Sequence, residues 1–313
     1  MFGTFVGISV YDADGKAAEK AMEAAFAEIE RIDAKFNSKR EGSLVYKINH
    51  MENSPESPKE IPLDEEGEYL FSKIREAWER SGGEYDVTLG PMMALWGFGQ
   101  EDPEKLRIPS AGEIASVLQT VDFSKVSFAD GKLSIAWPVR EIDTGSFLKG
   151  YALQRAWTVL EKKGIKSAFI TSVSSIAAVG SKPEGIPWRI GIQNPADLSA
   201  LLGAVDLKER AMGVSGDYQT FLEIDGKLWH HILKKTTGFP VDDKKMTVVI
   251  APDAFMADIY STCFFLMPVD KILDFVYTNN YLDILIVKSN GEIIMSDGFP
   301  LIKLGETGKS RHD

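Results

Sequence analysis

Hydrophobic positions recur at helical spacing through the first quarter of the chain. After a strand-like opening at Thr4–Tyr11, this spacing predicts a long helix from about Lys16 to Phe36. A second amphipathic helix is expected from about Asp64 to Ser81, where Gly82-Gly83 ends it. Each helix is expected to bury one face against a core. The apolar face of the first helix carries Ala21, Ala25, Ile29 and Ile32.

Less regular segments follow each of these helices. Residues 51–63 are polar and rich in proline, and we expect a loop there. Residues 83–99 are rich in glycine and aromatic side chains and are also expected to form a loop. Residues 111–120 are predicted to be helical.

In the remainder of the chain, short strands and turns alternate with helices. A helix is expected at about 146–163, with strands near 165–173 and 187–193. Interleaved helices and hairpins favour an α+β fold over a doubly wound sheet, with mixed, mostly antiparallel sheets that carry packed helices. We expect two intimately packed lobes that together form a single domain over residues 1–313. The pairs that predict hairpin turns are Asp130-Gly131, Asp225-Gly226 and Asn290-Gly291.

The most informative segment is residues 246–264, in which a strand leads into a helix. Residues 248–250 are typical of a buried strand, and Asp253 is a reasonable N-cap for the helix that follows. That helix is apolar on nearly every side, so it is expected to be buried rather than amphipathic. A narrow polar stripe nevertheless runs along it at positions i, i+3 and i+4, formed by Asp258, Ser261 and Thr262.

Two interpretations of this stripe stay open. A buried carboxylate is costly unless a cation or several donors meet it, and three oxygen atoms on one helix face suit a hard cation such as Mg²⁺. The stripe then predicts Asp258, Ser261 and Thr262 as metal ligands. Alternatively, the two hydroxyls bond to carbonyls of the preceding turn while Asp258 pairs with a neighbouring lysine.

A second polar motif lies at the start of the helix expected at 146–163. Thr144, Gly145 and Ser146 are small residues at a helix start, where backbone N–H groups without partners bind anions such as a phosphate or diphosphate. Lys149 in the first turn adds a positive charge for the same anion. The alternative is ordinary capping of the helix beside a solvated lysine.

Composition and charge narrow the function classes. The chain is 44% hydrophobic and 26% charged, as in ordinary globular proteins. Its net charge of −11 argues against a nucleic-acid groove or an anionic membrane surface as the partner. The single cysteine, Cys263, excludes an internal disulfide and cannot form a zinc site alone. No segment reaches the length of a membrane span, and no secretory signal or lipid-anchoring cysteine precedes the first strand.

Seven segments of the chain carry motifs that belong together. They are Phe2–Thr4, Tyr85–Gly99, Asp143–Ala152, Trp188–Pro195, Val214–Tyr218, His231–Pro240 and Ala257–Thr262. In this order, and over nearly the whole sequence, they resemble the motifs of the ApbE-type flavin transferases (FAD:protein FMN transferases). The third segment matches the Asp-x-Gly-x-x-Lys-Gly-Tyr-Ala motif of that family, and the last matches its Ala-Asp-x-x-Ser-Thr motif.

The resemblance implies a reaction and an ApbE-like flavin cleft. Enzymes of this family bind FAD with Mg²⁺ on its diphosphate and break the bond between the two phosphates. They move FMN onto a threonine or serine hydroxyl of a partner protein, and AMP is released. FAD is then expected in a cleft lined by residues 85–99, 142–152, 231–240 and 257–262.

Carried over by position, the resemblance also implies site residues. Asp258 is expected to be both the catalytic residue and a metal ligand, together with Ser146, Ser261 and Thr262. The residues expected to contact the FAD are Phe2, Trp96, Gly97, Phe98, Asp143, Lys149 and Ile232.

Four departures from the family pattern bear on activity. Phe2 replaces a methionine, Lys39 stands where many members carry a stacking tyrosine, and Lys234-Lys235 replaces Asp-Pro. The largest departure is Ser172-Val173-Ser174-Ser175 in place of Asn-x-Gly-Gly. Because serine lacks the backbone freedom of glycine, two interpretations stay open: Ser174 and Ser175 crowd the flavin, or they lie away from it in a remodelled loop.

The sequence therefore predicts Mg²⁺-dependent transfer of FMN from FAD to an acceptor protein of a flavin-dependent redox system. Hydrolysis of FAD to FMN and AMP, and binding of FAD without catalysis, stay open as alternatives. No nucleic acid and no membrane span is expected. The resemblance implies a location on the periplasmic side of the cell envelope, with the export signal outside this sequence, and a cytoplasmic location is the alternative.

Overall fold

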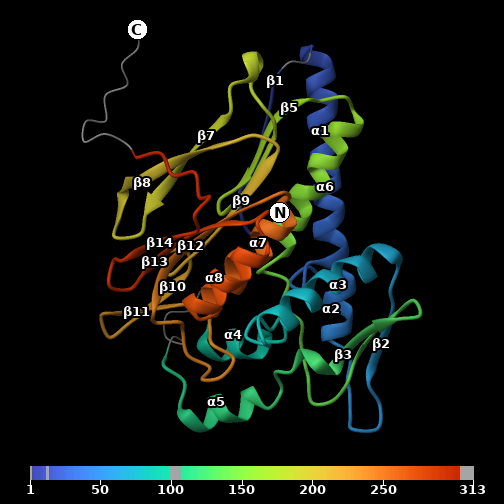
Figure 1. Cartoon of the computed structure of the whole chain (residues 1–313). Helices are drawn as coiled ribbons and strands as arrows, with labels where there is room; N and C mark the ends of the chain where they lie inside the picture. The colour runs from blue at the N-terminus through green and yellow to red at the C-terminus, as the bar shows by residue number, and fades with distance from the viewer. Residues whose placement is uncertain (1, 12–13, 99–106, 304–313) are drawn as a thin grey trace.

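An antiparallel sheet of seven strands forms the centre of the molecule (Figure 1). The computed structural model describes residues 2–11, 14–98 and 107–303. In spatial order the strands are β1 (Gly7–Tyr11), β5 (Ser167–Ser172), β6 (Ser175–Gly180), β9 (Arg210–Gly216), β12 (Lys244–Ala251), β13 (Asp283–Lys288) and β14 (Ile293–Met295).

Helices cover one face of this sheet. The core on this face joins the apolar sides of these helices to inward-facing strand residues such as Ile170 and Ala177. Three of the helices begin at an aspartate, Asp14, Asp64 or Asp253, whose carboxylate accepts from a backbone N–H of the first turn. The helices are α1 (Gly15–Phe36), α3 (Glu65–Arg80), α6 (Leu148–Lys162), α7 (Ala254–Leu266) and α8 (Val269–Thr278).

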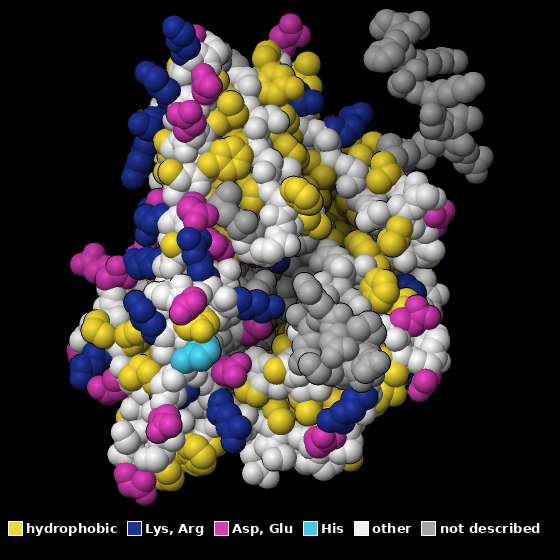
Figure 2. All heavy atoms as spheres, turned by 180° about the vertical axis from the view of Figure 1, so that it is seen from behind, with side chains coloured by type: hydrophobic (Ala, Val, Ile, Leu, Met, Phe, Trp, Pro, Cys, Tyr) yellow, Lys and Arg dark blue, Asp and Glu magenta, His cyan; other side chains and the backbone are white. Residues whose placement is uncertain are grey.

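A long hairpin of β7 (Trp188–Asn194) and β8 (Asp197–Leu207) packs on the other face of the sheet. Trp188 anchors it, because its ring stacks on Phe169 of β5 at 5.3 Å and meets Tyr11 of β1 edge-on at 5.4 Å. Seen from behind, hydrophobic side chains gather along the middle of the molecule, with charged side chains along the edge that α1 forms (Figure 2). The sheet is thus buried on both faces.

Smaller elements form the second lobe, in the lower part of Figure 1. A separate apolar cluster there joins Met92 and Trp96 to Ile114 and Leu233. The elements are α2 (Leu44–Asn49), α4 (Gly90–Trp96), α5 (Ala111–Leu118), the sheet β2 (Lys59–Pro62), β4 (Lys132–Ile135) and β3 (Val126–Ala129), and the hairpin β10 (Phe221–Ile224) and β11 (Lys227–His230). Short 3₁₀ turns occupy Phe123–Lys125 and Pro183–Gly185.

The predicted α+β class, the long helices and all three hairpin turns are confirmed. The loops predicted at 51–63 and 83–99 are wrong in part, because β2 forms in the first and α4 in the second. A signal for α4 was present: Pro91 lies in its first turn and Gly97 ends it in a left-handed conformation. Gly99, the last residue of that motif, lies outside the described residues.

In the described part of the chain, no helix combines the length and apolar character that crossing a bilayer requires. The interpretation of residues 1–313 as a single domain stays a prediction.

Candidate functional site

A cavity of about 490 Å³ opens where the two lobes meet. Its wall is built from Phe2 near the N-terminus, the start of α4, the segment before α6, the end of β9 and helix α7. Eight of the predicted site residues line it: Phe2, Phe98, Asp143, Ser146, Lys149, Ile232, Asp258 and Thr262. Residues from positions 2 to 262 therefore converge on one site.

Asp258 lies on α7, 4% exposed, and each of its carboxylate oxygens accepts a hydrogen bond. Ser175 of β6 donates from Oγ to Oδ1 at 2.7 Å, and the backbone N–H of Gly150 in α6 donates to Oδ2 at 2.8 Å. The approach of α6 requires glycine at 150, because a Cβ there would lie 2.3 Å from the Cβ of Asp258. Asp258 thus meets a hydroxyl and an amide rather than the lysine of the alternative interpretation.

The two hydroxyls of the stripe have different surroundings. Thr262 lines the cavity, but Ser261 is 1% exposed and does not. The Ser261 hydroxyl donates to the carbonyl oxygen of Asp258 at 2.9 Å, as the back-bonding alternative expected. Ser215 of β9 lies within 2.9 Å of the Ser261 hydroxyl and 3.1 Å of the Thr262 hydroxyl.

The start of α6 differs from the expected anion-binding end. The helix begins at Leu148 rather than near residue 146. The backbone N–H of Thr144 donates to the Oγ of Ser38 at 3.4 Å, and that of Gly145 donates to Oδ1 of Asp143 at 2.6 Å. These two groups are therefore already paired within the protein.

Polar side chains of this segment still face the cavity. The Oγ of Ser146 forms a hydrogen bond of 2.9 Å with the hydroxyl of Tyr85, and burial raises the pKa of that phenol above its usual value. Lys149 donates to the carbonyl of Gly145 at 3.3 Å and lines the cavity. The cavity wall thus carries one cationic group, that of Lys149, and the hydroxyls of Ser146 and Tyr85.

Trp96 and Gly97 do not line the cavity. Trp96 is fully buried, donates from Nε1 to the carbonyl of Gly238 at 2.8 Å, and stacks on Phe98 at 6.2 Å. Gly97 ends α4 at φ 82°, which turns the chain so that Phe98 reaches the cavity wall. Trp96 is therefore a core residue, whereas Phe98 is part of the cavity wall.

His231 also lines the cavity, although no role was predicted for it from the sequence. Its Nδ1–H donates to the carbonyl of Thr220 at 3.1 Å, which places the proton on Nδ1. Burial lowers the pKa of His231 to about 4, so the ring is neutral at physiological pH. The sequence signal was the histidine that opens the His231–Pro240 motif.

The positions that depart from the family pattern have specific partners. Phe2 has a positive φ of 52°, and its N–H donates to Asp33 at 3.0 Å. The side chain of Ser175 meets Asp258, so only Ser174 of the serine pair lines the cavity, as Lys39 does. Lys235 forms an ion pair of 2.7 Å with Asp86.

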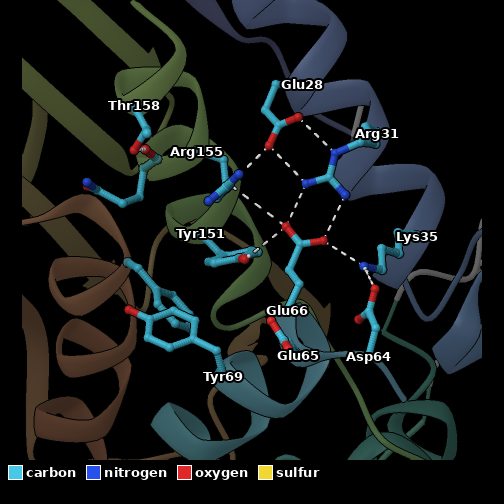
Figure 3. Close-up of a pocket in the computed structure, with 12 residues that line it drawn as sticks. Glu28, Arg31, Lys35, Asp64, Glu65, Glu66, Tyr69, Tyr151, Arg155 and Thr158 are labelled. Atoms are coloured by element: carbon cyan, nitrogen blue, oxygen red, sulfur yellow. Dashed lines mark hydrogen bonds and ion pairs between the residues drawn. The ribbon is translucent and has the colours of Figure 1, made fainter. Parts of the chain in front are cut away.

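A larger, shallower depression of about 730 Å³ lies among α1, α3 and α6 (Figure 3). Its centre is Glu66, which accepts from Arg31 and Lys35 at 2.6 Å each and from the Tyr151 hydroxyl at 3.1 Å. Burial raises the pKa of Glu66, but these hydrogen bonds outweigh it and lower that pKa to about 2. Because Arg31 also pairs with Glu28, the charges neutralise one another, and this network joins helices rather than forming a reaction site.

The fold and the cavity define an α+β protein with an oxygen-rich site between two lobes. The sequence model of the ApbE family matches residues 2–286, and the chain belongs to that family. This confirms the resemblance seen in the sequence.

Relatives and solved structures agree with the family. The FAD:protein FMN transferase of Haemophilus influenzae is 29% identical over 302 residues, covering 93% of this chain and 85% of its own length. That of Klebsiella pneumoniae is 27% identical, covering 97% and 88%. The ApbE protein of Thermotoga maritima superposes with a TM-score of 0.84 at 31% identity, and the flavinyl transferase ApbE of Pseudomonas stutzeri with 0.80 at 26%; each match covers 95% of both chains.

Proposed function

We propose that this chain transfers the FMN part of FAD to a threonine or serine hydroxyl of a partner protein and releases AMP. One observation carries the proposal: a single cavity joins Asp258, Thr262 and Ser146 to the neutral ring of His231. The substrate class comes from family membership and from relatives named FAD:protein FMN transferases.

The donor set fits Mg²⁺, and we assign it to Asp258, Thr262 and Ser146. In the described part of the chain no three His, Cys, Asp or Glu side chains cluster as a metal site. One carboxylate with hydroxyl oxygens is nevertheless a suitable set for a hard cation that also binds phosphate and water. Bound Mg²⁺ supplies neutralisation of the negative charge on the diphosphate. Ser261 is left out of the ligand set, because it does not line the cavity.

Apolar and cationic groups of the wall suit the remainder of FAD. Phe2, Phe98 and Ile232 give the cavity apolar surface for the flavin ring. Lys149 supplies a positive charge for the diphosphate, and Asp143 holds the turn before α6 through its bond to Gly145.

His231 takes the proton of the acceptor. The hydroxyl oxygen forms a bond to the FMN phosphorus while the bond from that phosphorus to the bridging oxygen breaks, and AMP leaves with the bridging oxygen. The hydroxyl proton passes to Nε2 of His231, since Nδ1 carries the other proton. Among the described residues, no hydrogen bond occupies Nε2.

Incubation of the pure protein with FAD and Mg²⁺, with and without peptides that contain a central threonine or serine, tests the proposal. Transfer gives a peptide whose mass rises by FMN minus water, with one AMP per modified peptide. Free FMN and AMP in equal amounts, without a modified peptide, would instead indicate hydrolysis. Intact bound FAD would indicate a flavin-binding protein without catalysis.

The partner is proposed to be an acceptor protein of a flavin-dependent redox system. Family membership supports this class of partner and, with it, a location on the periplasmic side of the cell envelope.

A further inference from the structure

Three hydroxyls meet at the cavity wall, between β9 and α7, and two of them, those of Ser215 and Thr262, belong to residues that line the cavity. The Oγ of Ser215 lies 2.9 Å from the Oγ of Ser261 and 3.1 Å from the Oγ1 of Thr262. The Ser261 hydroxyl also donates to the carbonyl oxygen of Asp258. Ser215 is 6% exposed and Ser261 1%, so bulk water has little access to the bond between these two hydroxyls.

The three hydrogen bonds determine the direction of every hydroxyl proton. A carbonyl oxygen only accepts, so the single proton of Ser261 is committed to Asp258. Ser215 must then donate to Ser261, and Thr262 must donate to Ser215, because each hydroxyl has one proton. No other order keeps all three bonds. The oxygen of Thr262 is left with lone pairs alone for the cavity that it lines.

This polarity is the one that a cation requires, because a hydroxyl binds a metal through a lone pair. We propose that Ser215 is a positioning residue, which draws the Thr262 proton away from the cavity so that Thr262 presents only lone pairs to a divalent cation. The inference rests on the proposed function, in which Thr262 and Asp258 hold Mg²⁺. It also gives Ser261 a role, as the acceptor of the Ser215 proton rather than a ligand.

The carboxylate of Asp258 is also held in place by hydrogen bonds. Ser175 and the amide of Gly150 each donate to one of its oxygens, which holds the carboxylate in place and leaves its other lone pairs available. Two of the three expected ligands, Asp258 and Thr262, are therefore oriented by hydrogen bonds to residues of neighbouring elements.

The affinity for Mn²⁺ tests the proposal, since Mn²⁺ takes the same oxygen ligands as Mg²⁺. Mn²⁺ is titrated into the FAD-loaded protein, and the free ion is measured by electron paramagnetic resonance. Ser215→Ala removes the acceptor and frees the Thr262 proton to turn into the cavity. We expect binding about 10- to 100-fold weaker than in the wild type, the usual effect of losing a group that orients a ligand.

Thr247→Val is the matched control. The hydroxyl of Thr247 in β12 is fully buried and donates to the backbone carbonyl of Ser261 at 2.7 Å. Its loss removes a buried hydrogen bond between the same sheet and the same helix without changing the order of the three hydroxyls. We expect a lower thermal midpoint with Mn²⁺ affinity within about twofold of the wild type.

A double-mutant cycle separates positioning from direct ligation or general damage. Thr262→Val should weaken Mn²⁺ binding, and adding Ser215→Ala should cause no further loss, because Ser215 acts only through Thr262. Losses that multiply in the double variant would overturn the proposal. Ser261→Ala offers a second variant, whose loss should likewise vanish in the Ser215→Ala background.

Variants of the ligands and of Ser215 distinguish a wrong metal site from a wrong role for Ser215. If Asp258→Asn and Thr262→Val both leave Mn²⁺ affinity unchanged, the metal site of the proposed function is wrong. If those variants weaken binding but Ser215→Ala does not, the metal site stands and the role of Ser215 is overturned.

Discussion

Asp258 is held by donors from two elements that lie far from it in the sequence. Ser175 is 83 residues away and Gly150 is 108 residues away, yet each donates to one carboxylate oxygen. The serine that departs from the family pattern is thus used to orient the expected metal ligand. The Ser175 side chain thus contacts the carboxylate, and only Ser174 of the two serines lines the cavity.

Asp258→Asn is expected to keep the fold and to lose activity. The Ser175 hydroxyl can turn to accept from the new amide, while the Gly150 N–H donates to the remaining oxygen, so both bonds survive. Loss of the negative charge should lower kcat at limiting Mg²⁺ at least a hundredfold, roughly the effect of one strong electrostatic contact. Transfer kinetics over a Mg²⁺ series measure this, and wild-type kinetics in the variant would contradict the assignment.

The control is Asp253→Asn, at the N-cap of the same helix. The side chain of Asp253 accepts from the N–H of Met256 at 2.8 Å, and asparagine caps equally well. Activity should therefore change little.

His231 should determine how activity falls on the acid side of the pH–rate profile. With a pKa of about 4, its ring is a base throughout the range above that value, so activity should fall only as the pH approaches 4 rather than near 6.5. The charged and titratable groups that act on it are His230, Lys149 and Asp143. His231→Asn should lower kcat about 10²- to 10⁴-fold and remove this limb, as pH–rate profiles would show. An unchanged acid limb in the variant would exclude His231 as the base.

The same group links stability to pH. Because the folded pKa is depressed below that of the unfolded chain, the unfolded state binds the proton first as the pH falls. This contribution to stability is fully present above about 6.5 and is lost as the pH falls towards 4. In His231→Asn the loss should be smaller, and what remains should include His230, whose pKa burial also lowers.

Among the elements, the β5–β6 hairpin has a strained turn. Its two-residue turn places Val173 at φ 46°, a conformation that β-branched residues rarely adopt, with 72% of the residue exposed. Ser174 has no such strain, and its carbonyl accepts from the N–H of Val214 at 2.8 Å. The strain is therefore confined to one residue at the tip of the hairpin.

Glycine substitutions in this turn should have opposite effects. Val173→Gly relieves the positive φ and should raise the free energy of unfolding by about 1 kcal/mol, after the entropy cost of glycine is subtracted. Ser174→Gly gains nothing and should lower it by about 0.5–1 kcal/mol. Denaturant titrations of both variants measure these changes, and a loss of stability in Val173→Gly would show that the turn is unstrained.

At the scale of the whole molecule, an ion pair joins the segment before α4 to the loop that carries His231. The Asp86 carboxylate is inaccessible to solvent and accepts from Lys235, from Thr88 and from the N–H of Phe123. Lys235 follows β11 and reaches across to the segment before α4. Of the two lysines that depart from the family pattern, Lys235 thus forms a structural ion pair with Asp86.

Lys235→Met should destabilise the protein, because it removes the only side-chain cation that the described residues place on Asp86. Three other hydrogen bonds remain on that carboxylate, so the loss should be about 1–3 kcal/mol rather than that of a fully stranded charge. Lys234→Met is the control, since its pair with the exposed Asp242 should contribute no more than about 1 kcal/mol. Both free energies of unfolding are measured by denaturant titration. Equal losses in the two variants would show that the Lys235–Asp86 ion pair contributes no more than the exposed pair.

Local signals in the sequence determined where several elements begin and end. Aspartate N-caps open α1, α3 and α7, and Asp-Gly or Asn-Gly pairs form the three predicted hairpin turns. These features depend on neighbouring residues alone, so they can be read without the fold. The order of the motifs likewise identified the family and eight of the residues that line the cavity.

Only the tertiary structure decided which of these residues face the cavity and which way their protons point. Trp96 and Phe98 are two positions apart, yet one is core and the other is wall. Ser261 and Thr262 are adjacent, but only Thr262 lines the cavity. The physical reason is that these roles are set by partners such as Ser215, which another strand brings into contact over a separation of 46 residues. Such contacts leave no periodic trace in the sequence.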